Sequence, residues 1–501
     1  MSDVTKADID SDIDPVSSAL AQRLRAAAPH LLPGGADLDT SAGPLLKHLV
    51  LAARGSRRDE DLWLLIVAIT GRFPEAEHVR GARAALRHST EADATLLLLS
   101  ELADLARHSE NLRRPMVVIE EATVVDVDFC ARHDHNTGIQ RVVRQTMSRW
   151  ADAYAPTFVA WTDFGHAMRE IGPYERKRVV DWGTKIEGEP EGKDELAALP
   201  IVVPLRSNVL VSEVPRTELC LAQTAISEFS GNTVHLIGYD AIPIVSADTV
   251  PHHETERFVR YLNLVKHATR VLAISDAVAE EFSGFAMSVT AQGLSGPKVV
   301  SVPLPVDIPD ARPASDDVAP AGRLVLCVGS HEPRKNHHAV LFAAELLWNE
   351  GLQFSLRFVG GGSIWYTRIF DKQVKRLQKA GRDVQVLRGV SDEEMLALYR
   401  EATFSVFPSL QEGFGLPVAE SLALNTPVIT TSYGSTGEIA RDGGCLTVDP
   451  RDDESIVTAM RELLTNQERV QELQREIAHR PRRSWDAYAH DLASHVVGGR
   501  A

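Results

Sequence analysis

The chain has 501 residues, of which 44% are hydrophobic and 24% are charged, and its formal net charge is -16. This length exceeds one ordinary core, and domains of roughly 100–200 residues predict two to four folding units. The acidic balance argues against nucleic acid as the main partner, because binding to a phosphate backbone requires clustered Lys and Arg.

The cysteines and the apolar runs indicate the compartment. The four cysteines, at 130, 220, 327 and 445, are far apart and form no CxxC pair, which argues against a disulfide framework or a zinc site and fits a reducing cytoplasm. The acidic N-terminus MSDVTKADIDSDID is not typical of a secretory signal. The longest apolar run, LWLLIVAIT at 62–70, is too short to span a bilayer. We therefore expect a cytoplasmic protein whose membrane contact, if it has any, is peripheral and at the inner face.

The first 115 residues predict a helical unit behind a disordered tail. Residues 1–15 are acidic and poor in large apolar side chains, which is typical of disorder. In 16–115, Leu and Ala recur at helical spacing in five stretches, at 18–28, 43–54, 60–69, 75–87 and 94–107. No strand pattern interrupts them, so we expect an all-α N-terminal domain.

From residue 116 onward, short β-branched runs alternate with helical stretches. A first series predicts strands at 123–129, 157–161, 201–205, 208–211, 233–238, 270–275 and 298–304, with helices at 137–151 and 254–268. After a Pro- and Asp-rich linker at 308–322, a second series predicts strands at 324–329, 354–360, 383–387, 404–408, 427–430 and 445–448. Its predicted helices are at 336–350, 366–380, 391–401 and 417–424. The alternation predicts an α/β fold with two domains, at 116–310 and 311–480, a final segment at 481–501, and a ligand cleft between the two domains.

The loop after the strand at 324–329 is a candidate anion site. It reads SHEPRKNHHAV, and places Arg334 and Lys335 just before a helix. Two cations beside the backbone N–H groups of a helix start suit a phosphate or diphosphate. Taken alone, this loop is better explained as a solvated basic turn.

The loop after the strand at 404–408 carries two spaced carboxylates. It reads SLQEGFGLPVAES, with Glu412 on the loop and Glu420 about one turn into a helix that Pro417 begins. Glycines at 413 and 415 allow a ligand to approach the backbone. Since both loops leave the same sheet edge, they predict one extended ligand: a diphosphate at the cations and hydroxyl-rich ends at the carboxylates.

These residues resemble the signatures of glycosyltransferase family 4, the retaining nucleotide-sugar enzymes of the GT-B fold. PRKN (333–336) and the E-x7-E motif EGFGLPVAE (412–420) carry the resemblance, which extends more weakly over about 120–495. NTGIQRVVR (136–144) and YDAIPIVSADTVP (239–251) are most similar to bacterial mannosyltransferase-like members. The resemblance implies two Rossmann-like domains facing a cleft, with a C-terminal helix that crosses back to the first.

The resemblance also implies a role for each matching residue. Arg334, Lys335 and Glu412 would be catalytic: the cations neutralise the leaving diphosphate and Glu412 contacts the donor sugar. The remaining donor contacts would be Gly138, Tyr239, Asp240, Ser275, Gly413, Phe414, Gly415, Leu416 and, on the nucleotide ribose, Glu420. Many members have His where this chain has Tyr239. No metal is expected, and the donor would be a GDP- or UDP-linked sugar, with GDP-mannose favoured.

The implied reaction is transfer of a sugar, with retained anomeric configuration, to a hydroxyl of a glycan or a lipid-linked acceptor, as in the synthesis of a bacterial surface polysaccharide. Two alternatives stay open: a sugar-nucleotide epimerase on the same fold, and an interaction protein that works through 16–115. We expect a docking, assembly or self-association role for that helical segment.

His133, Asp134 and His135 are better explained by a polar loop than by a metal site. The short basic run HRPRRSW (479–485) is a candidate for contact with anionic lipid.

Overall fold

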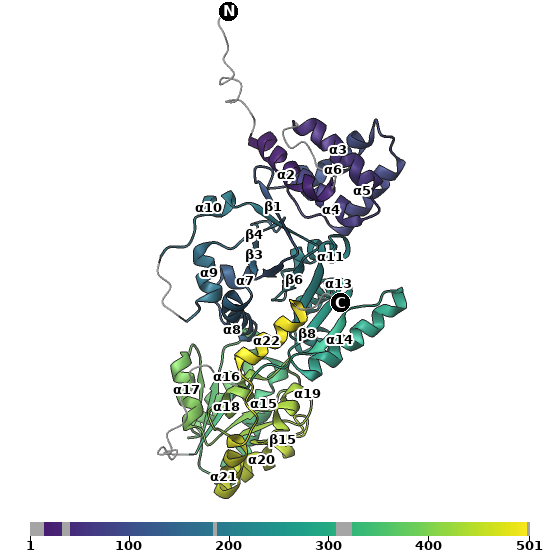
Figure 1. Cartoon of the computed structure of the whole chain (residues 1–501). Coiled ribbons are helices and arrows are strands. Elements are labelled where there is room, and N and C mark those ends of the chain that lie inside the picture. Colours follow the sequence, from purple (N-terminus) through teal and green to yellow (C-terminus); the bar gives the residue numbers. More distant parts are fainter. Residues whose placement is uncertain (1–14, 33–40, 184–187, 307–322, 498–501) are drawn as a thin grey trace, which may run out of the picture.

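The computed structural model describes residues 15–32, 41–183, 188–306 and 323–497. A helical N-terminal part, a first α/β part and a second α/β part follow one another along the molecule (Figure 1). The α/β fold predicted from the alternating pattern is confirmed, with the all-α segment in front of it. The tail predicted at 1–15, apart from Pro15, and the linker predicted at 308–322 lie outside the described residues.

Helices alone make up the described N-terminal part. They are α2 (Pro15–Leu31), α3 (Ala42–Gly55), α4 (Asp59–Thr70), α5 (Ala76–His88) and α6 (Ala94–Arg107). Helix α4 is central, because its residues from Leu62 to Thr70 are all buried and it contacts each of the other four helices. A helix that is apolar on every side is stable only inside a core.

The N-terminal helices share one hydrophobic core with the first sheet. Phe73 lies between Trp63 of α4 and Trp161 of the sheet, with ring centroids 5.4 and 5.7 Å away. The fully buried Arg23 of α2 donates from Nε to Ala68 O at 2.9 Å and from Nη1 to Leu112 O at 2.8 Å. These bonds satisfy carbonyls at the end of α4 and in the segment that enters the sheet. The helices are therefore packed directly against the sheet and are not joined to it by the chain alone.

The first sheet has nine strands in the described residues. They are β1 (Met116–Glu120), β2 (Thr123–Asp126), β3 (Thr157–Trp161), β4 (Met168–Glu170), β5 (Ile201–Leu205), β6 (Asn208–Val211), β7 (Thr233–Gly238), β8 (Arg270–Ala273) and β9 (Lys298–Ser301). Their order is β1-β5-β4-β3-β2-β6-β7-β8-β9, and all neighbours are parallel except β4 against β3 and β5. The helices are α7 (Asp128–Arg132), α8 (Gly138–Ala153), α9 (Pro173–Val180), α10 (Lys193–Ala198), α11 (Cys220–Phe229), α12 (Ile242–Val245), α13 (His252–His267) and α14 (Asp276–Val289).

Two strands of this sheet are absent from the sequence prediction, and three are predicted too long: β2, β8 and β9, which end at Asp126, Ala273 and Ser301. β4 is short, and its Arg169 is buried only because it donates twice to Glu175, at 2.7 and 2.8 Å. β1 lies where the helical pattern of the N-terminal part gives way to the alternating α/β pattern, and the sequence did not distinguish it as a strand. β2 ends at Asp126 rather than continuing to 129, because Asp126 Oδ1 accepts Asp128 N at 3.1 Å as α7 begins.

The second sheet has six parallel strands in the described residues. They are β10 (Leu324–Val328), β11 (Ser355–Val359), β12 (Val384–Leu387), β13 (Phe404–Phe407), β14 (Val428–Thr431) and β15 (Cys445–Val448), in the order β12-β11-β10-β13-β14-β15. The helices are α15 (His337–Asn349), α16 (Ile364–Lys379), α17 (Asp392–Glu401), α18 (Leu416–Ala423), α19 (Gly434–Ala440), α20 (Asp453–Thr465) and α21 (Gln467–Ala478). The strands are short apolar runs, as expected where helices cover both faces of a parallel sheet.

The last helix, α22 (Trp485–Val496), packs against the first α/β part rather than the second (Figure 1). Trp150 of α8 donates from its indole to Ala489 O at 2.9 Å, and Tyr488 is fully buried in the core shared with the first sheet. Among the described residues, none of the helices combines the length and the apolar character needed to cross a membrane.

Candidate active site

The second sheet brings two loops together where its strand order reverses. β10 lies between β11 and β13, and successive strands run outward on both sides. Ligands of open parallel sheets bind at the carboxyl ends of the strands at such a point. The loop after β10 contains Arg334 and Lys335 in the 3-10 turn Pro333–Lys335, and the loop after β13 contains Glu412. The loops touch, since Leu410 N donates to Arg334 O at 2.7 Å.

Arg334, Lys335 and Glu412 form a buried ion cluster. Lys335 Nζ lies 2.5 Å from Glu412 Oε1, and Arg334 Nη1 lies 2.9 Å from Oε2. Burial alone would raise the pKa of Glu412, but the two cations outweigh it and hold that pKa below 4.5. Burial lowers the pKa of Lys335 below 10.5, against the pull of Glu412. A ligand that draws Glu412 onto its own hydroxyls would leave both cations available to an anion.

The first α/β part faces this cluster with Tyr239 and Asp240, which follow β7. Burial raises the pKa of Asp240, and Arg334 acts against that rise. The Tyr239 hydroxyl donates to Ser212 O at 2.7 Å, and burial raises its pKa well above 10. The Tyr239 side chain is therefore anchored within the first part by its hydroxyl.

Several contacts join the two α/β parts around the ion cluster. Ser275 Oγ donates to Gly413 O at 2.7 Å, and a Cβ on Gly413 would lie 2.1 Å from Tyr239 O, so only glycine fits there. On the outer side, Glu438 of α19 accepts Asp276 N at 3.0 Å and Ala277 N at 2.6 Å. A carboxylate from one part thus caps helix α14 of the other, where the helix dipole favours negative charge.

Glu420 lies one turn into α18 and is held from two sides. Tyr399, which is fully buried, donates its hydroxyl to Oε2 at 3.0 Å. Arg141 of α8, on the first part, forms an ion pair with Oε1. The carboxylate keeps 15% of its side chain exposed, so it lines the boundary between the parts and is open to a ligand that displaces Arg141.

The remaining predicted donor contacts meet at the start of two facing helices. Gly138 begins α8, and a Cβ there would lie 3.0 Å from Leu416 at the start of α18. Gly415 has a φ of 105° and a Cβ there would lie 2.7 Å from Thr436 Cγ2, so this position requires glycine. Phe414 is buried in the core that reaches the first part. All twelve predicted residues therefore gather along one boundary.

The contact residues that were not predicted from the sequence include Tyr399 beside Glu420 and, across the boundary, Arg141, Glu281, Gln411 and Glu438. Gln411 donates to Glu281 of α14 and accepts from Ser246 Oγ, so the loop before Glu412 is tied to the first part. Arg141 lies within the quoted segment NTGIQRVVR, and Gln411 directly precedes the E-x7-E motif. Their partners are more than a hundred residues away in sequence, and a single sequence carries no signal for such pairs.

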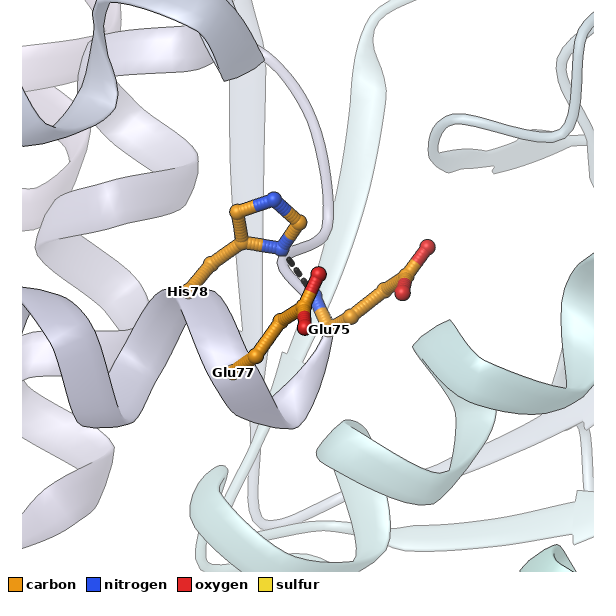
Figure 2. A group of neighbouring side chains, drawn as sticks. All are labelled: Glu75, Glu77 and His78. Carbon is orange, nitrogen blue, oxygen red and sulfur yellow. Dashed lines mark hydrogen bonds between the residues drawn. The ribbon is translucent and has the colours of Figure 1, made fainter.

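One three-residue group in the described part of the chain has a spacing that suits a metal ion: Glu75, Glu77 and His78 (Figure 2). Its geometry has a simpler explanation, because His78 Nδ1 accepts the Glu75 N–H at 3.2 Å in the cap of α5. It lies in the N-terminal helices, apart from the ion cluster. Asp134, which was weighed as a ligand with His133 and His135, pairs with Arg178 at 2.8 Å.

Comparison with known proteins agrees with this geometry. Residues 314–480 match the family described as glycosyl transferases group 1. Over 336 residues and 64% of its length, the chain is 26% identical to the serotype-specific mannosyltransferase WbdA of Escherichia coli, of which it spans 40%. It is also 34% identical over 131 residues, 26% of its length, to the O-antigen chain mannosyltransferase B of Escherichia coli, of which it spans 34%.

Solved structures share the fold at low identity. A sucrose-phosphate synthase from Thermosynechococcus elongatus superposes with a TM-score of 0.51 at 16% identity, over 75% of this chain and 98% of that one. A UDP-forming trehalose-phosphate synthase from Burkholderia vietnamiensis superposes with a TM-score of 0.52 at 13% identity, over 76% of this chain and 98% of that one. The chain therefore has the GT-B fold of glycosyltransferases. Residues 314–480 match the group 1 glycosyltransferase model, the relatives named above are mannosyltransferases, and the resemblance predicted from the sequence is confirmed.

Proposed function

We propose that the protein is a retaining glycosyltransferase that moves a hexose from a nucleoside diphosphate to a hydroxyl of a glycan or lipid-linked acceptor. The observation that carries this proposal is the buried cluster of Arg334, Lys335 and Glu412 at the switch point of the second sheet, with Asp240 facing it from the first. Two cations and a carboxylate that can be redirected to hydroxyls match a sugar diphosphate.

The donor lies along the boundary in an extended form. Glu420 accepts hydrogen bonds from the ribose once Arg141 is displaced. Arg334 and Lys335 bind the diphosphate. Glu412 turns to the sugar hydroxyls, together with the backbone of Gly413, Phe414, Gly415 and Leu416.

The first α/β part closes over the donor. Gly138 lets the start of α8 approach the diphosphate, because a side chain there would press on Leu416. Asp240 lies beside the sugar. Tyr239 and Ser275 act through the backbone of Gly413, which they hold in place, rather than through direct chemistry on the donor.

The chemistry rests on stabilising the leaving group. As the bond between the anomeric carbon and the diphosphate breaks, charge grows on the phosphate oxygens, and preorganised cations at that point lower the barrier. The two glutamates are not a glycosidase pair flanking the scissile bond, because Glu420 is assigned to the ribose at the far end. No side chain is assigned as a nucleophile.

We propose that the diphosphate needs no metal ion, because Arg334 and Lys335 supply its counter-charge. Turnover that is unchanged by a chelator supports this, and activity that returns only on adding Mg²⁺ or Mn²⁺ contradicts it.

We favour mannose as the sugar, because the relatives named above are mannosyltransferases and the segments at 136–144 and 239–251 are of that type.

For the acceptor we propose a cavity of about 380 Å³ at the carboxyl ends of β2 and β6, lined among others by Asp128, His133, Glu213 and Arg216. Such polar groups suit sugar hydroxyls. The cavity adjoins the site through Ser212, which precedes Glu213 and accepts the Tyr239 hydroxyl. We propose that the reaction takes place in the cytoplasm, in keeping with four unpaired cysteines.

Calorimetry with GDP-, UDP- and other nucleotide sugars tests the proposal. We expect one donor class to bind, and Glu420→Gln to weaken binding about tenfold, as for the loss of a hydrogen bond to a charged group. The matched control is Glu401→Gln on the exposed end of α17. Binding of no nucleotide sugar would sink the proposal. Product formed without any acceptor and epimerised in the sugar would favour the epimerase alternative.

A further inference from the structure

Helix α16 presents an exposed apolar surface to solvent. Ile364, Trp365 and Ile369 are 73%, 82% and 59% exposed. The opposite side of the helix, with Thr367, Phe370, Val374 and Leu377, packs against the second sheet and α15. Isolated exposed apolar residues are common, but three within the first two turns of one helix, one of them tryptophan, form a patch.

The same side of α16 carries a row of cations. Arg368, Lys372, Lys375 and Lys379 are all exposed and are spaced by four, three and four residues, which aligns them along the helix. The fifth cation, Arg376, pairs with Glu345 at 2.5 Å. Asp371 is the one carboxylate within α16, and it pairs with Arg388 at 2.7 Å. Neither carboxylate therefore neutralises the row.

We propose that α16 docks the protein on the surface of an anionic lipid bilayer. Trp and Ile at one end of a helix can enter the headgroup region, while Lys and Arg beside them bind anionic lipid. A chain with net charge -16 is repelled by such a surface as a whole, so attraction requires a local basic face of this kind. We name the eight residues from Ile364 to Lys379 on this side, Arg376 included, the α16 face.

The basic run at 479–485, which the sequence singled out for lipid contact, is less suited to that role. Arg480 is turned inward and donates to Ile439 O at 2.9 Å, with 6% of its side chain exposed. Arg483 pairs with Asp491 at 2.6 Å. Two of its three arginines are therefore engaged within the protein.

The α16 face lies next to the loop that carries the site cations. Trp365 and Ile369 line a cavity of about 220 Å³ together with Glu332 and Pro333, directly before Arg334. A Cβ on Gly362, in the turn that leads into α16, would lie 2.9 Å from His331 Cβ, so the turn is packed on that loop. Docking through this face would hold the donor site near the bilayer, where a lipid-linked acceptor is anchored.

The experiment measures co-sedimentation of the full chain with vesicles of neutral phosphatidylcholine and with vesicles that also contain phosphatidylglycerol. We expect binding to the anionic vesicles only, weakened by salt. The variant K372E/K375E should lose at least about tenfold in vesicle affinity, since each basic residue near the surface contributes to binding. The control K47E/R87E changes net charge equally but alters exposed residues of α3 and α5, and should bind as the wild type does.

A second pair of variants tests the apolar half. W365S/I369S should weaken binding, whereas F164S, which removes an aromatic ring that is 72% exposed elsewhere, should not. Absence of vesicle binding, or equal loss in K47E/R87E, would overturn the proposal, as would binding to heparin without binding to vesicles. The inference goes beyond the transfer reaction and stands apart from it: nucleotide-sugar binding by the α16 variants should equal that of the wild type.

Discussion

Glu412 sets the charge balance of the site at the scale of single residues. Two cations are buried against it, and its own pKa stays below 4.5 because they outweigh the cost of burial. Without a carboxylate at 412, Lys335 would have no ion-pair partner within the described ranges, and Arg334 would keep, of the partners in those ranges, Glu332 at 2.9 Å. The residue that we propose as the contact of the donor sugar is therefore also part of what holds the two loops together.

Glu412→Gln should destabilise the protein by about 3 kcal/mol at about pH 7, the cost of leaving a buried charge without its partner. The pKa of Glu412 is depressed in the folded state, so its contribution is present above the unfolded value of 4.5 and is lost as the pH falls through the folded value. The difference in the free energy of unfolding between wild type and variant should therefore narrow below that pH. Denaturant unfolding across a pH series measures this difference.

The control for this series is Glu332→Gln, whose side chain is 34% exposed and which should cost under about 1 kcal/mol. If the difference in the free energy of unfolding between wild type and Glu412→Gln widens as the pH falls, the conclusion that Glu412 is ionised in the folded protein is contradicted.

In the proposed donor complex, Arg141 competes with the ribose for Glu420. Since the free carboxylate is available only when the ion pair is open, Arg141→Ala should tighten nucleoside binding about fivefold by removing that competing state. Arg149→Ala, which removes an exposed pair on the same helix, should leave affinity unchanged. Titration of guanosine and uridine decides the matter. If Arg141→Ala and Glu420→Gln both weaken binding, Arg141 contacts the nucleotide itself.

At the scale of elements, the closed arrangement depends on helix ends. α18 begins beside Gly138, and α14 begins at the carboxylate of Glu438. These contacts add hydrogen bonds and close approaches to the apolar cluster around Phe414, Val418 and Ile439, which also reaches the first part.

Glu438→Ala should loosen this closure, because it removes a cap on α14 that comes from the other α/β part. The expected result is a larger radius of gyration in small-angle scattering of the donor-free protein, and a KM for donor raised about three- to tenfold, in line with the loss of about 1 kcal/mol for a helix cap. Glu280→Ala, exposed on α14, is the control. An unchanged radius and KM would show that Glu438 does not govern closure.

The sequence predicted most strands of both sheets, because buried parallel strands are short apolar runs. It missed β4, whose Arg169 is stabilised by a salt bridge that no local pattern reveals. The loop placement of Glu412 and the helical placement of Glu420 followed from Pro417 and the glycines. The partner of Glu420 in the first part, Arg141, could not follow, because this contact depends on how two distant sheets face each other.

At the scale of the whole molecule, the N-terminal helices belong to the core of the first α/β part. Trp161 packs on Phe73, and Arg23 binds carbonyls at the entrance to the sheet. A role in assembly for 16–115 stays a prediction. The shared core means that this segment cannot act only as a removable docking module.

Deletion of residues 1–115 should therefore yield insoluble or unfolded protein, because it uncovers the apolar surface around Trp161. Deletion of 1–14 is the control, and should leave the far-UV circular dichroism spectrum and the melting temperature unchanged. A soluble, folded product from the longer deletion would contradict the shared core.

The central claim, that Arg334, Lys335, Glu412 and Glu420 bind and activate a sugar diphosphate, is tested most directly by following donor turnover by NMR with an oligosaccharide acceptor. The account predicts release of nucleoside diphosphate, a glycoside with the anomeric configuration of the donor, and loss of turnover in Glu412→Gln and Lys335→Met that exceeds any loss of fold. A folded wild type that turns over no nucleotide sugar, or a product of inverted configuration, would contradict it.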